Sequence, residues 1–468
     1  MSLKTTEQYL ESLRDGREIY WDGDRIEDVT ADPRFAVPLA MAGRDYAYDD
    51  PEHGALRRYE TEEGGVANRI FQVPRTTEDL QRRLAFSRTL SHVTGVSGVF
   101  MALLTAKDEI ARVNPDYAAN IERIYRYARD NDLRGAEVIS DPKGDRKRRA
   151  QEQDDPDLYV RIVDRTAEGI VVRGAKLHIT AASLVHELVV MPTKGMKQEE
   201  ADYAVSFSIP VNTPGVKIIN RSVSMSRPNP FDYPASAHHS MPEGFVIFDD
   251  VLVPWDRVFL AGEIRLASTL ARSLGLWERT VGVIEAVRQS ELLVGLAQLV
   301  SEMQGKERDP LVLASIADLI AYHELLRMGL EYSVEHPQTT PSGMIHPNTL
   351  AINVAKYHYA ANYHAMVAKL HDVSGGLVVT LPGEKDLRNE ATGKYMRKYL
   401  HTRDDVDVED RMRVYNMIRD FTADAYGGWA MVAALQGGGG LAAQRFMMNM
   451  AFDMERARAA ARRASGIV

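Results

Sequence analysis

The densest positive charge in the sequence is the run Arg146-Lys147-Arg148-Arg149. Guanidinium groups bind phosphate through paired hydrogen bonds, so such a run suits a phosphate-bearing ligand. The run lies where helical patterns give way to strand patterns, and a cofactor cleft would open at such a junction. The alternative is a solvated charged loop without a ligand, and the residues alone leave both interpretations open.

The histidines offer acid–base chemistry but no metal site. His92 lies on an apolar helical stretch, where it is either a pocket residue or a hydrogen-bonded core residue. His178, His186, His238 and His239 fall among the strand patterns, and none has a partner at a metal-ligand spacing with a nearby acid. We therefore predict no metal, and retain His239 as a candidate acid–base group.

Several catalytic classes are missing from the sequence. There is no cysteine, which excludes a thiol nucleophile and Cys-ligated zinc or iron–sulfur sites. The motifs of serine hydrolases, zinc proteases and Rossmann dinucleotide sites are also absent. The glycines Gly437–Gly440 lack the surrounding residues of a phosphate loop and predict a break between two helices.

Helical patterns dominate from residue 76 to about residue 134. Thr76 and Asp79 form a capping box at the start of the first helix. Pro115 begins a second segment, in which Ile121 and Ile124 share one apolar face. The first sixty residues show little periodicity.

Strand patterns follow from Asp155. The runs 158–163 and 170–173 flank a turn, which is typical of a hairpin. Further strand-like runs, separated by turns that contain Pro or Gly, lie at 187–191, 203–209, 216–220 and 245–253. We therefore predict that the middle third is an antiparallel β domain.

Long helical patterns return after Gly262. They cover 264–305, 309–334, 347–372, 406–434 and 441–464, which is typical of an antiparallel helix bundle. The predicted class is therefore α+β with three domains. These are a mainly helical domain at 1–145, a β-barrel-like domain at 146–262 and a helical bundle at 263–468.

Composition restricts the partners and the compartment. The 468 residues carry a net charge of −9 with acids and bases finely mixed, which argues against a nucleic-acid partner. The longest weakly polar run, 93–106, is shorter than the ~18 residues of a membrane span. The N-terminal segment has no apolar core behind its lysine, unlike a signal peptide, so we expect a cytoplasmic protein.

Seven short motifs occur in order along the chain: YLESLRDGR at 9–17, YRYARDNDL at 125–133, DPKGDR at 141–146, DLYVR at 157–161, GIVVRGAK at 169–176, FDDVLVPW at 248–255 and LP at 381–382. In sequence and order they resemble the 4-hydroxyphenylacetate 3-hydroxylase family of two-component flavin monooxygenases, and the likeness runs from near residue 7 to about residue 430. The order of helical, β and bundle regions is also similar to the acyl-CoA dehydrogenase architecture, in which flavin lies between the β domain and the helices.

The resemblance implies reduced FAD supplied by a separate NAD(P)H:flavin reductase, a flavin hydroperoxide, and oxygen transfer to a phenol ortho to its hydroxyl group. Residues 147–149 and 424–425 depart from the family pattern. The residues that the resemblance assigns to the cofactor are Arg146 at the pyrophosphate, Thr180 at the isoalloxazine edge, and Tyr426 and Gly427 at a C-terminal flavin contact. Arg148 is a further candidate for the pyrophosphate on the positive charge of the run alone.

The substrate residues depart most from the family. Its Arg and Tyr, which hold the phenol oxygen, fall on Val96 and Phe100, and its His falls on Glu137. Apolar side chains give a phenolate no donor, and an ionised Glu137 would repel it. We therefore predict an aromatic or nitrogen-containing substrate, free or bound to a carrier, that is not a simple phenol held in the family manner. Glu137 either acts on a substrate nitrogen or forms a salt bridge with Arg134, and His92 is a fourth candidate catalytic residue.

Two other functions stay open at this point. One is an oxygen-independent flavin enzyme on an acyl thioester, with Glu137 as the base, and the other is a non-catalytic family member. A 4-hydroxybutyryl-CoA dehydratase resembles the chain in architecture but ligates an iron–sulfur cluster through cysteines, which this chain lacks. The long C-terminal helices and the related architecture predict a homotetramer.

Overall fold

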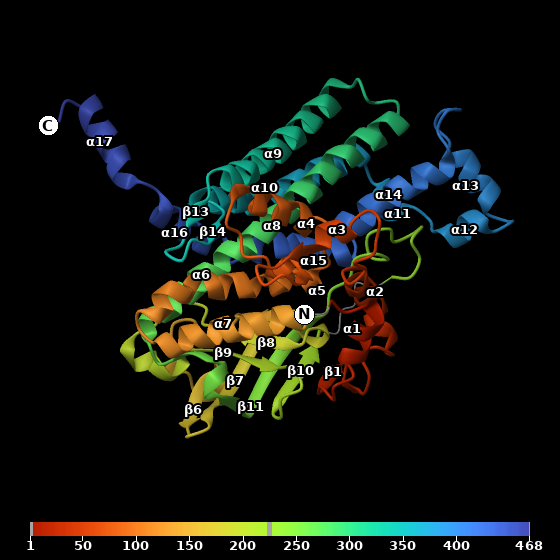
Figure 1. Ribbon diagram of the computed structural model, residues 1–468. Coiled ribbons are helices and arrows are strands. Elements are labelled where there is room, and N and C mark those ends of the chain that lie inside the picture. The colour runs from red at the N-terminus through yellow and green to blue at the C-terminus, as the bar shows by residue number, and fades with distance from the viewer. Residues whose placement is uncertain (1–2, 222–226, 468) are drawn as a thin grey trace.

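The computed structural model describes residues 3–221 and 227–467. Two β-sheets lie at one end of the molecule and the long C-terminal helices at the other, with the helices of the N-terminal region between them (Figure 1). Helix α7 packs on β12 of the sheets, α6 packs on α7, and α8 of the bundle packs on α6. The N-terminal helices therefore connect the β region to the bundle.

The N-terminal region contains helices and short strands. The helix predicted at Thr76 is confirmed, because Asp79 N–H donates to the Thr76 hydroxyl at 3.2 Å and the helix runs to Ser87. The helix predicted at Pro115 is also confirmed. The elements are α1 Thr6–Ser12, β1 Ile19–Trp21, β2 Asp24–Ile26, α2 Ala36–Arg44, α3 Gly54–Arg57, β3 Arg58–Glu60, β4 Val66–Asn68, α4 Thr77–Ser87, α5 His92–Gly95, α6 Val99–Ala111 and α7 Pro115–Asp130.

The β region consists of a six-stranded sheet, ordered β2-β1-β10-β11-β7-β6, and a four-stranded sheet, ordered β12-β9-β8-β5. The prediction of antiparallel pairing holds for most pairs, but β1 pairs with β10 and β5 with β8 in parallel. Strands β1, β2 and β5 also lie outside residues 146–262. The remaining strands are β5 Gly135–Val138, β6 Arg161–Arg165, β7 Gly169–Thr180, β8 Glu187–Val190, β9 Val205–Pro210, β10 Val216–Asn220, β11 Glu243–Pro254 and β12 Val258–Ala261.

The C-terminal region contains the predicted long helices, with two breaks. The pattern at 406–434 divides into α14 and α15, and the pattern at 441–464 into α16 and α17. A helix break at Gly437–Gly440 is confirmed, because Gly438 and Gly439 have φ of +71° and +89°. The elements are α8 Ile264–Met303, α9 Pro310–Glu335, α10 Thr349–Ser374, α11 Leu377–Thr380, α12 Glu384–Arg388, α13 Gly393–Tyr399, α14 Val408–Thr422, α15 Ala425–Gln436, α16 Leu441–Ala451 and α17 Met454–Ala464.

Helix α8 links two hydrophobic cores. Its residues up to Trp277 belong to the core that the sheets share with the N-terminal helices. Its residues from Val283 onward belong to the core of the bundle. The boundary between the cores thus falls on one helix, between Trp277 and Val283. In the described residues, no helix is long and apolar enough to cross a membrane.

Candidate active site

A cavity of about 440 Å³ lies where the two cores meet. Trp277, Thr280 and Ile284 line it from the boundary segment of α8. The other walls come from α2, α3, α4, α5 and the segment before β11, so N-terminal helices, β region and bundle all contribute. This volume is in the range of small-molecule sites.

His92, a predicted site residue, lines this cavity at the first position of α5. Ser91 caps the helix, and its hydroxyl donates to the buried carboxyl group of Asp45. The His92 ring lies 6.3 Å from the Trp429 ring of α15. Burial lowers the pKa of His92, so at neutral pH the ring is uncharged, with one donor and one acceptor nitrogen.

A second histidine and an ion pair line the same cavity. Arg288 donates to Glu285 at 2.5 and 2.9 Å on α8. Burial opposes ionisation of Glu285, but the hydrogen bond and the charge of Arg288, with smaller contributions from His92 and Gln289, together outweigh it, and the pKa of Glu285 lies below its usual value. Burial and then the charge of Arg288 lower the pKa of His239 to about 4. The cavity therefore combines an ionised pair with two neutral histidines.

Tyr426 lies behind this cluster, at the start of α15. Its ring is stacked on Phe421 at 5.6 Å and lies 6.2 Å from the His239 ring. Gly427 allows α14 and α15 to approach each other, because a Cβ at this position would lie 2.3 Å from the carbonyl carbon of Thr422. Close packing of these two helices thus explains why a glycine occupies position 427. The same packing places Tyr426 beside the cavity.

Thr180 ends β7 at the junction between the β region and the bundle. Its hydroxyl donates to Glu243 of β11 at 3.2 Å. Burial raises the pKa of Glu243, which also has a hydrogen bond with Trp429. Trp429 lies beside His92, so the Thr180 hydroxyl is linked through two side chains to the cavity wall.

Glu137 lies on β5, and its carboxyl oxygen is 3.7 Å from the point where a Cβ of Gly98 would stand. Gly98 itself lines the cavity. Burial and then the negative charge of Glu278 raise the pKa of Glu137 well above its usual value. This shift favours the neutral form of the carboxyl group, which can donate a hydrogen bond, over the ionised form considered from the sequence.

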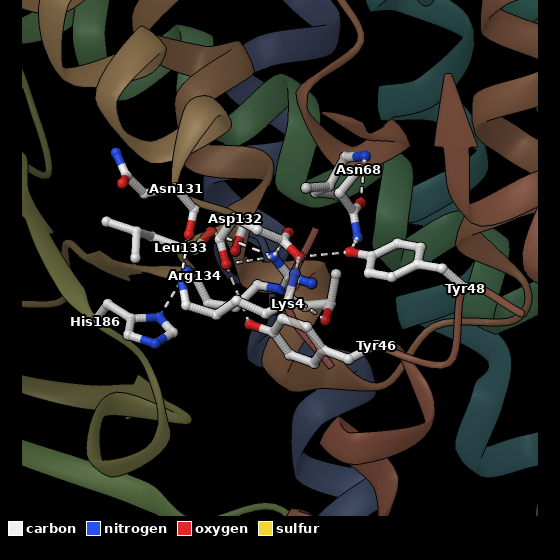
Figure 2. Close-up of polar contacts among 12 residues, drawn as sticks. Lys4, Tyr46, Tyr48, Asn68, Asn131, Asp132, Leu133, Arg134 and His186 are labelled. Atoms are coloured by element: carbon white, nitrogen blue, oxygen red, sulfur yellow. Dashed lines mark hydrogen bonds and ion pairs between the residues drawn. The ribbon is translucent and has the colours of Figure 1, made fainter. Parts of the chain in front are cut away.

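The alternative considered from the sequence, a salt bridge between Glu137 and Arg134, does not form among the described residues. Arg134 pairs instead with Asp132 at 2.8 Å, and its guanidinium group lies 4.2 Å from the centre of the Tyr46 ring. Figure 2 shows this buried cluster, in which Tyr48 donates to Asp132 and the backbone N–H of Arg134 donates to His186. Among the described residues, Glu137 has no ion-pair partner.

The two apolar candidates occupy different environments. Val96 is half-buried at the start of the single turn that joins α5 to α6. Phe100 is fully buried in α6, where its ring lies 5.6 Å from Phe71 and fills the space that a side chain at Gly135 would need. The structure thus gives Phe100 a packing role behind the cavity wall.

The basic run lies apart from the cavity. Arg146 and Arg148 are exposed, in the loop between β5 and β6. Arg148 is paired with Asp145 and Asp154. Among the described residues, Arg149 also has an acidic neighbour, Glu199, whereas Arg146 and Lys147 have no ion pair. Arg146 therefore offers a guanidinium group that is free for a phosphate.

The sequence did not single out Asp45, Glu243, Glu278, Glu285 or Arg288. The Glu285 and Arg288 spacing is an i, i+3 pair, which many exposed helices share, so the pattern carried no specific signal. Glu243 lies just before the strand-like run at 245–253 and belongs to no motif. Burial distinguishes these groups from surface charges, and burial depends on the fold.

A β region flanked by two helical regions, with a polar cavity at their junction, defines an enzyme of the acyl-CoA dehydrogenase-like architecture. Within that class, the chain belongs to the 4-hydroxyphenylacetate 3-hydroxylase family. It matches the family's N-terminal part over residues 5–260 and its C-terminal part over residues 267–466.

Individual relatives agree with this assignment. The chain is 30% identical to the 4-hydroxyphenylacetate 3-monooxygenase oxygenase component of Thermus thermophilus, over 91% of this chain and 89% of the relative. It is 29% identical to 4-hydroxybutyryl-CoA dehydratase/vinylacetyl-CoA-Delta-isomerase of Clostridium aminobutyricum, over 95% and 96%. A solved oxygenase component, HpaB, complexed with FAD superposes with a TM-score of 0.89 at 26% identity, over 98% of each chain.

The predictions of the family, the fold, an FADH2-dependent monooxygenase and FAD as its cofactor are confirmed by these comparisons. Membership in a family of oxygenase components supports the predicted need for a separate reductase.

Proposed function

We propose that this chain oxidises an aromatic or nitrogen-containing small molecule in the cavity beside Glu137, with O2 and reduced FAD from a separate NAD(P)H:flavin reductase. When bound, reduced FAD supplies the two electrons that convert one oxygen atom of O2 to water while the other enters the substrate. The observation that carries the proposal is the position of the Glu137 carboxyl group, which lies next to a cavity-lining residue and has no ion-pair partner among the described residues. Burial, with the charge of Glu278, raises its pKa and favours the neutral form.

The chain's own residues fit this cofactor. The Arg146 guanidinium group, free of acids among the described residues, suits the pyrophosphate. The Thr180 hydroxyl lies at the domain junction and suits a polar ring edge. Tyr426 and Gly427, at the start of α15, lie beside the same junction. Arg148 is neutralised by two acids and is a weaker candidate.

Glu137 then has two roles available in catalysis. In its neutral form it donates a hydrogen bond to a substrate oxygen or nitrogen, and in its ionised form it accepts a proton from a substrate N–H group. Because the pKa of Glu137 is raised, its protonated and ionised forms coexist at a higher pH than those of an ordinary glutamate. Neutral His92 adds a further donor and acceptor on the cavity wall.

The test is oxygen incorporation. The purified chain, FAD, NADH and a flavin reductase are incubated with candidate substrates under 18O2. One labelled oxygen atom in the product, with no product when either the reductase or O2 is omitted, supports the proposal. NADH oxidation by this chain without a reductase would contradict the two-component arrangement.

A second function is favoured by the similarity to the dehydratase/isomerase. In that case Glu137 removes a proton α to the carbonyl of an acyl thioester, and no O2 is needed. The same assay under anaerobic conditions separates the two, because only the second function survives the removal of O2. Reduced-FAD binding without any turnover would favour a non-catalytic member.

We also propose that the chain forms a homotetramer, in part through α9. Leu325, Met328 and Tyr332 lie on one side of α9, and each is about half-exposed. Helix α9 lies at the outer edge of the bundle, and α17, which buries no residue, extends away from the rest of the chain (Figure 1). Such an apolar face is typical of a surface that a second subunit covers.

A further inference from the structure

The charges that line the cavity do not balance. Five arginines line it, Arg44, Arg57, Arg83, Arg88 and Arg288, together with three acids, Asp45, Asp50 and Glu285.

Two of these arginines are neutralised by ion pairs. Arg288 pairs with Glu285 at 2.5 Å, and Arg57 pairs with Asp50 at 3.3 Å. The third acid, Asp45, is buried, and burial raises the pKa of its carboxyl group, which disfavours the charged form. Arg44, Arg83 and Arg88 therefore leave the cavity with an excess of positive charge.

Arg83 is the buried member of these three. It donates from Nη1 to the carbonyl oxygen of Ile70 at 2.9 Å and stands over the Trp277 ring at 5.3 Å. Within the described part of the chain it has no carboxylate partner, and Nε and Nη2 make no hydrogen bond. Arg83 lines the cavity and is 7% exposed, so these two donor groups are available to a ligand there.

Arg44 and Arg88 are exposed at the ends of α2 and α4. In the described residues neither has an ion pair or a side-chain hydrogen bond. Arg44 is close enough to His239 for its charge to make a small contribution, after burial, Arg288 and His92, to the low pKa of that histidine. The exposed arginines Arg44 and Arg88 thus place positive charge on the solvent-facing side of the cavity, and the charge of Arg44 also acts on His239.

We propose that this cavity binds an anionic group of the substrate, a carboxylate or a phosphate, through Arg44, Arg83 and Arg88. The inference rests on the proposed function, because it takes the cavity as the substrate site, and it adds a substrate class. The substrate then carries an aromatic or nitrogen-containing part for oxidation and a negative charge for binding. Long-range attraction by the same arginines favours the entry of such a ligand.

The test uses two probes with one ring system and opposite charges, indole-3-acetate and tryptamine. Their binding to the full chain is measured by isothermal titration calorimetry, which does not depend on turnover. We expect the acid to bind roughly tenfold more tightly than the amine. Arg44→Gln and Arg88→Gln are each expected to weaken the binding of the acid by roughly threefold to tenfold, with little effect on the amine.

The matched control is Arg82→Gln. Arg82 is exposed on α4, pairs with Glu78 at 2.6 Å and does not line the cavity. The control variant removes the same charge from the same helix and should leave the binding of both probes unchanged. An equal effect of Arg82→Gln, equal binding of the two probes to the unchanged chain, or no binding of the acid at millimolar concentration would overturn the proposal.

A final titration separates the substrate from the other source of anionic groups, the cofactor pyrophosphate. If Arg44→Gln and Arg88→Gln weaken reduced-FAD binding and leave the preference for the acid unchanged, the cations serve the cofactor and the proposal is wrong. The proposed function has its own test, 18O incorporation, and can fail while the charge preference stands.

Discussion

Arg134 and Asp132 form an ion pair at 2.8 Å in which the two side chains are 0% and 1% exposed. The Thr94 hydroxyl accepts from Arg134 Nε at 3.0 Å, so the pair also holds α5, on which His92 lies. Arg134 stands directly before β5 and three residues before Glu137. Because Asp132 supplies the counter-charge of this buried arginine, Arg134 does not pair with Glu137.

Breaking this pair should destabilise the fold. Asp132→Asn leaves a buried guanidinium group without its counter-charge, and we expect the free energy of unfolding to fall by about 3–5 kcal/mol. The measurement is urea denaturation. The control is Glu78→Gln, which breaks the exposed pair with Arg82 and should cost about 0–1 kcal/mol. Similar losses in both variants would contradict the structural role of the buried pair.

The raised pKa of Glu137 predicts a pH-dependent stability difference. A carboxyl group whose pKa is higher in the folded state contributes stability below its unfolded pKa and loses it as the pH rises through the folded pKa. Glu137→Gln cannot ionise, so the variant should be more stable than the unchanged chain at pH 8, by about 1.4 kcal/mol for each unit of the shift.

At pH 4 the two proteins should differ little, because the carboxyl group is then largely protonated in both states. Urea denaturation at a series of pH values between 4 and 8 measures the difference. A difference that does not grow with pH would show that Glu137 is well solvated and ionised in the folded protein.

Neighbouring glycines of α15 offer a matched pair of substitutions. Gly427→Ala places a methyl group 2.3 Å from the Thr422 backbone, so α14 and α15 must separate, and we expect a loss of at least about 2 kcal/mol. Gly428→Ala meets nothing within 4 Å and should stabilise the helix by about 0.5–1 kcal/mol. Thermal unfolding of both variants measures the contrast, and equal midpoints would contradict the close helix approach.

The proposed tetramer predicts that charge on α9 disrupts assembly. Leu325→Lys together with Met328→Lys places two charges on its exposed apolar face and should lower the mass measured by light scattering at micromolar protein concentration. Val379→Lys, at a side chain that is 67% exposed on α11, is the control and should leave the mass unchanged. A monomeric unchanged chain would show that the apolar face has another purpose.

Periodicity predicted the long elements of this fold because each buries a continuous face. The helices at 264–303 and 310–335 and the strands around 216–220 and 245–253 were all recognised from local pattern. Strands β1 and β5 were not, because three or four residues are too short for a pattern and their pairing is to β10 and β8, far along the chain. Parallel pairing of such short segments is decided by tertiary packing.

The site was predictable only in part, for a similar reason. His92 and Glu137 were identified from sequence and lie on or next to the cavity wall. Whether Arg134 would pair with Glu137 or Asp132 could not be decided from spacing, since both lie within three residues of it. The raised pKa of Glu137 could not be predicted from the sequence either, because it depends on burial that only the fold creates.

The last prediction concerns 4-hydroxyphenylacetate, which should be a poor substrate. The family resemblance places Val96 and Phe100 where an Arg and a Tyr hold the phenol oxygen, and neither side chain can donate a hydrogen bond. Losing two or three such hydrogen bonds costs roughly 3–6 kcal/mol in the transition state, or two to four powers of ten in rate. The measurement is hydroxylation with excess reductase, side by side with the Thermus thermophilus relative. Glu137→Gln should impair turnover of the true substrate and leave reduced-FAD affinity nearly unchanged, because the carboxyl group is assigned to the substrate. Comparable rates on the phenol, or lost FAD affinity with unchanged chemistry, would place the substrate pocket elsewhere.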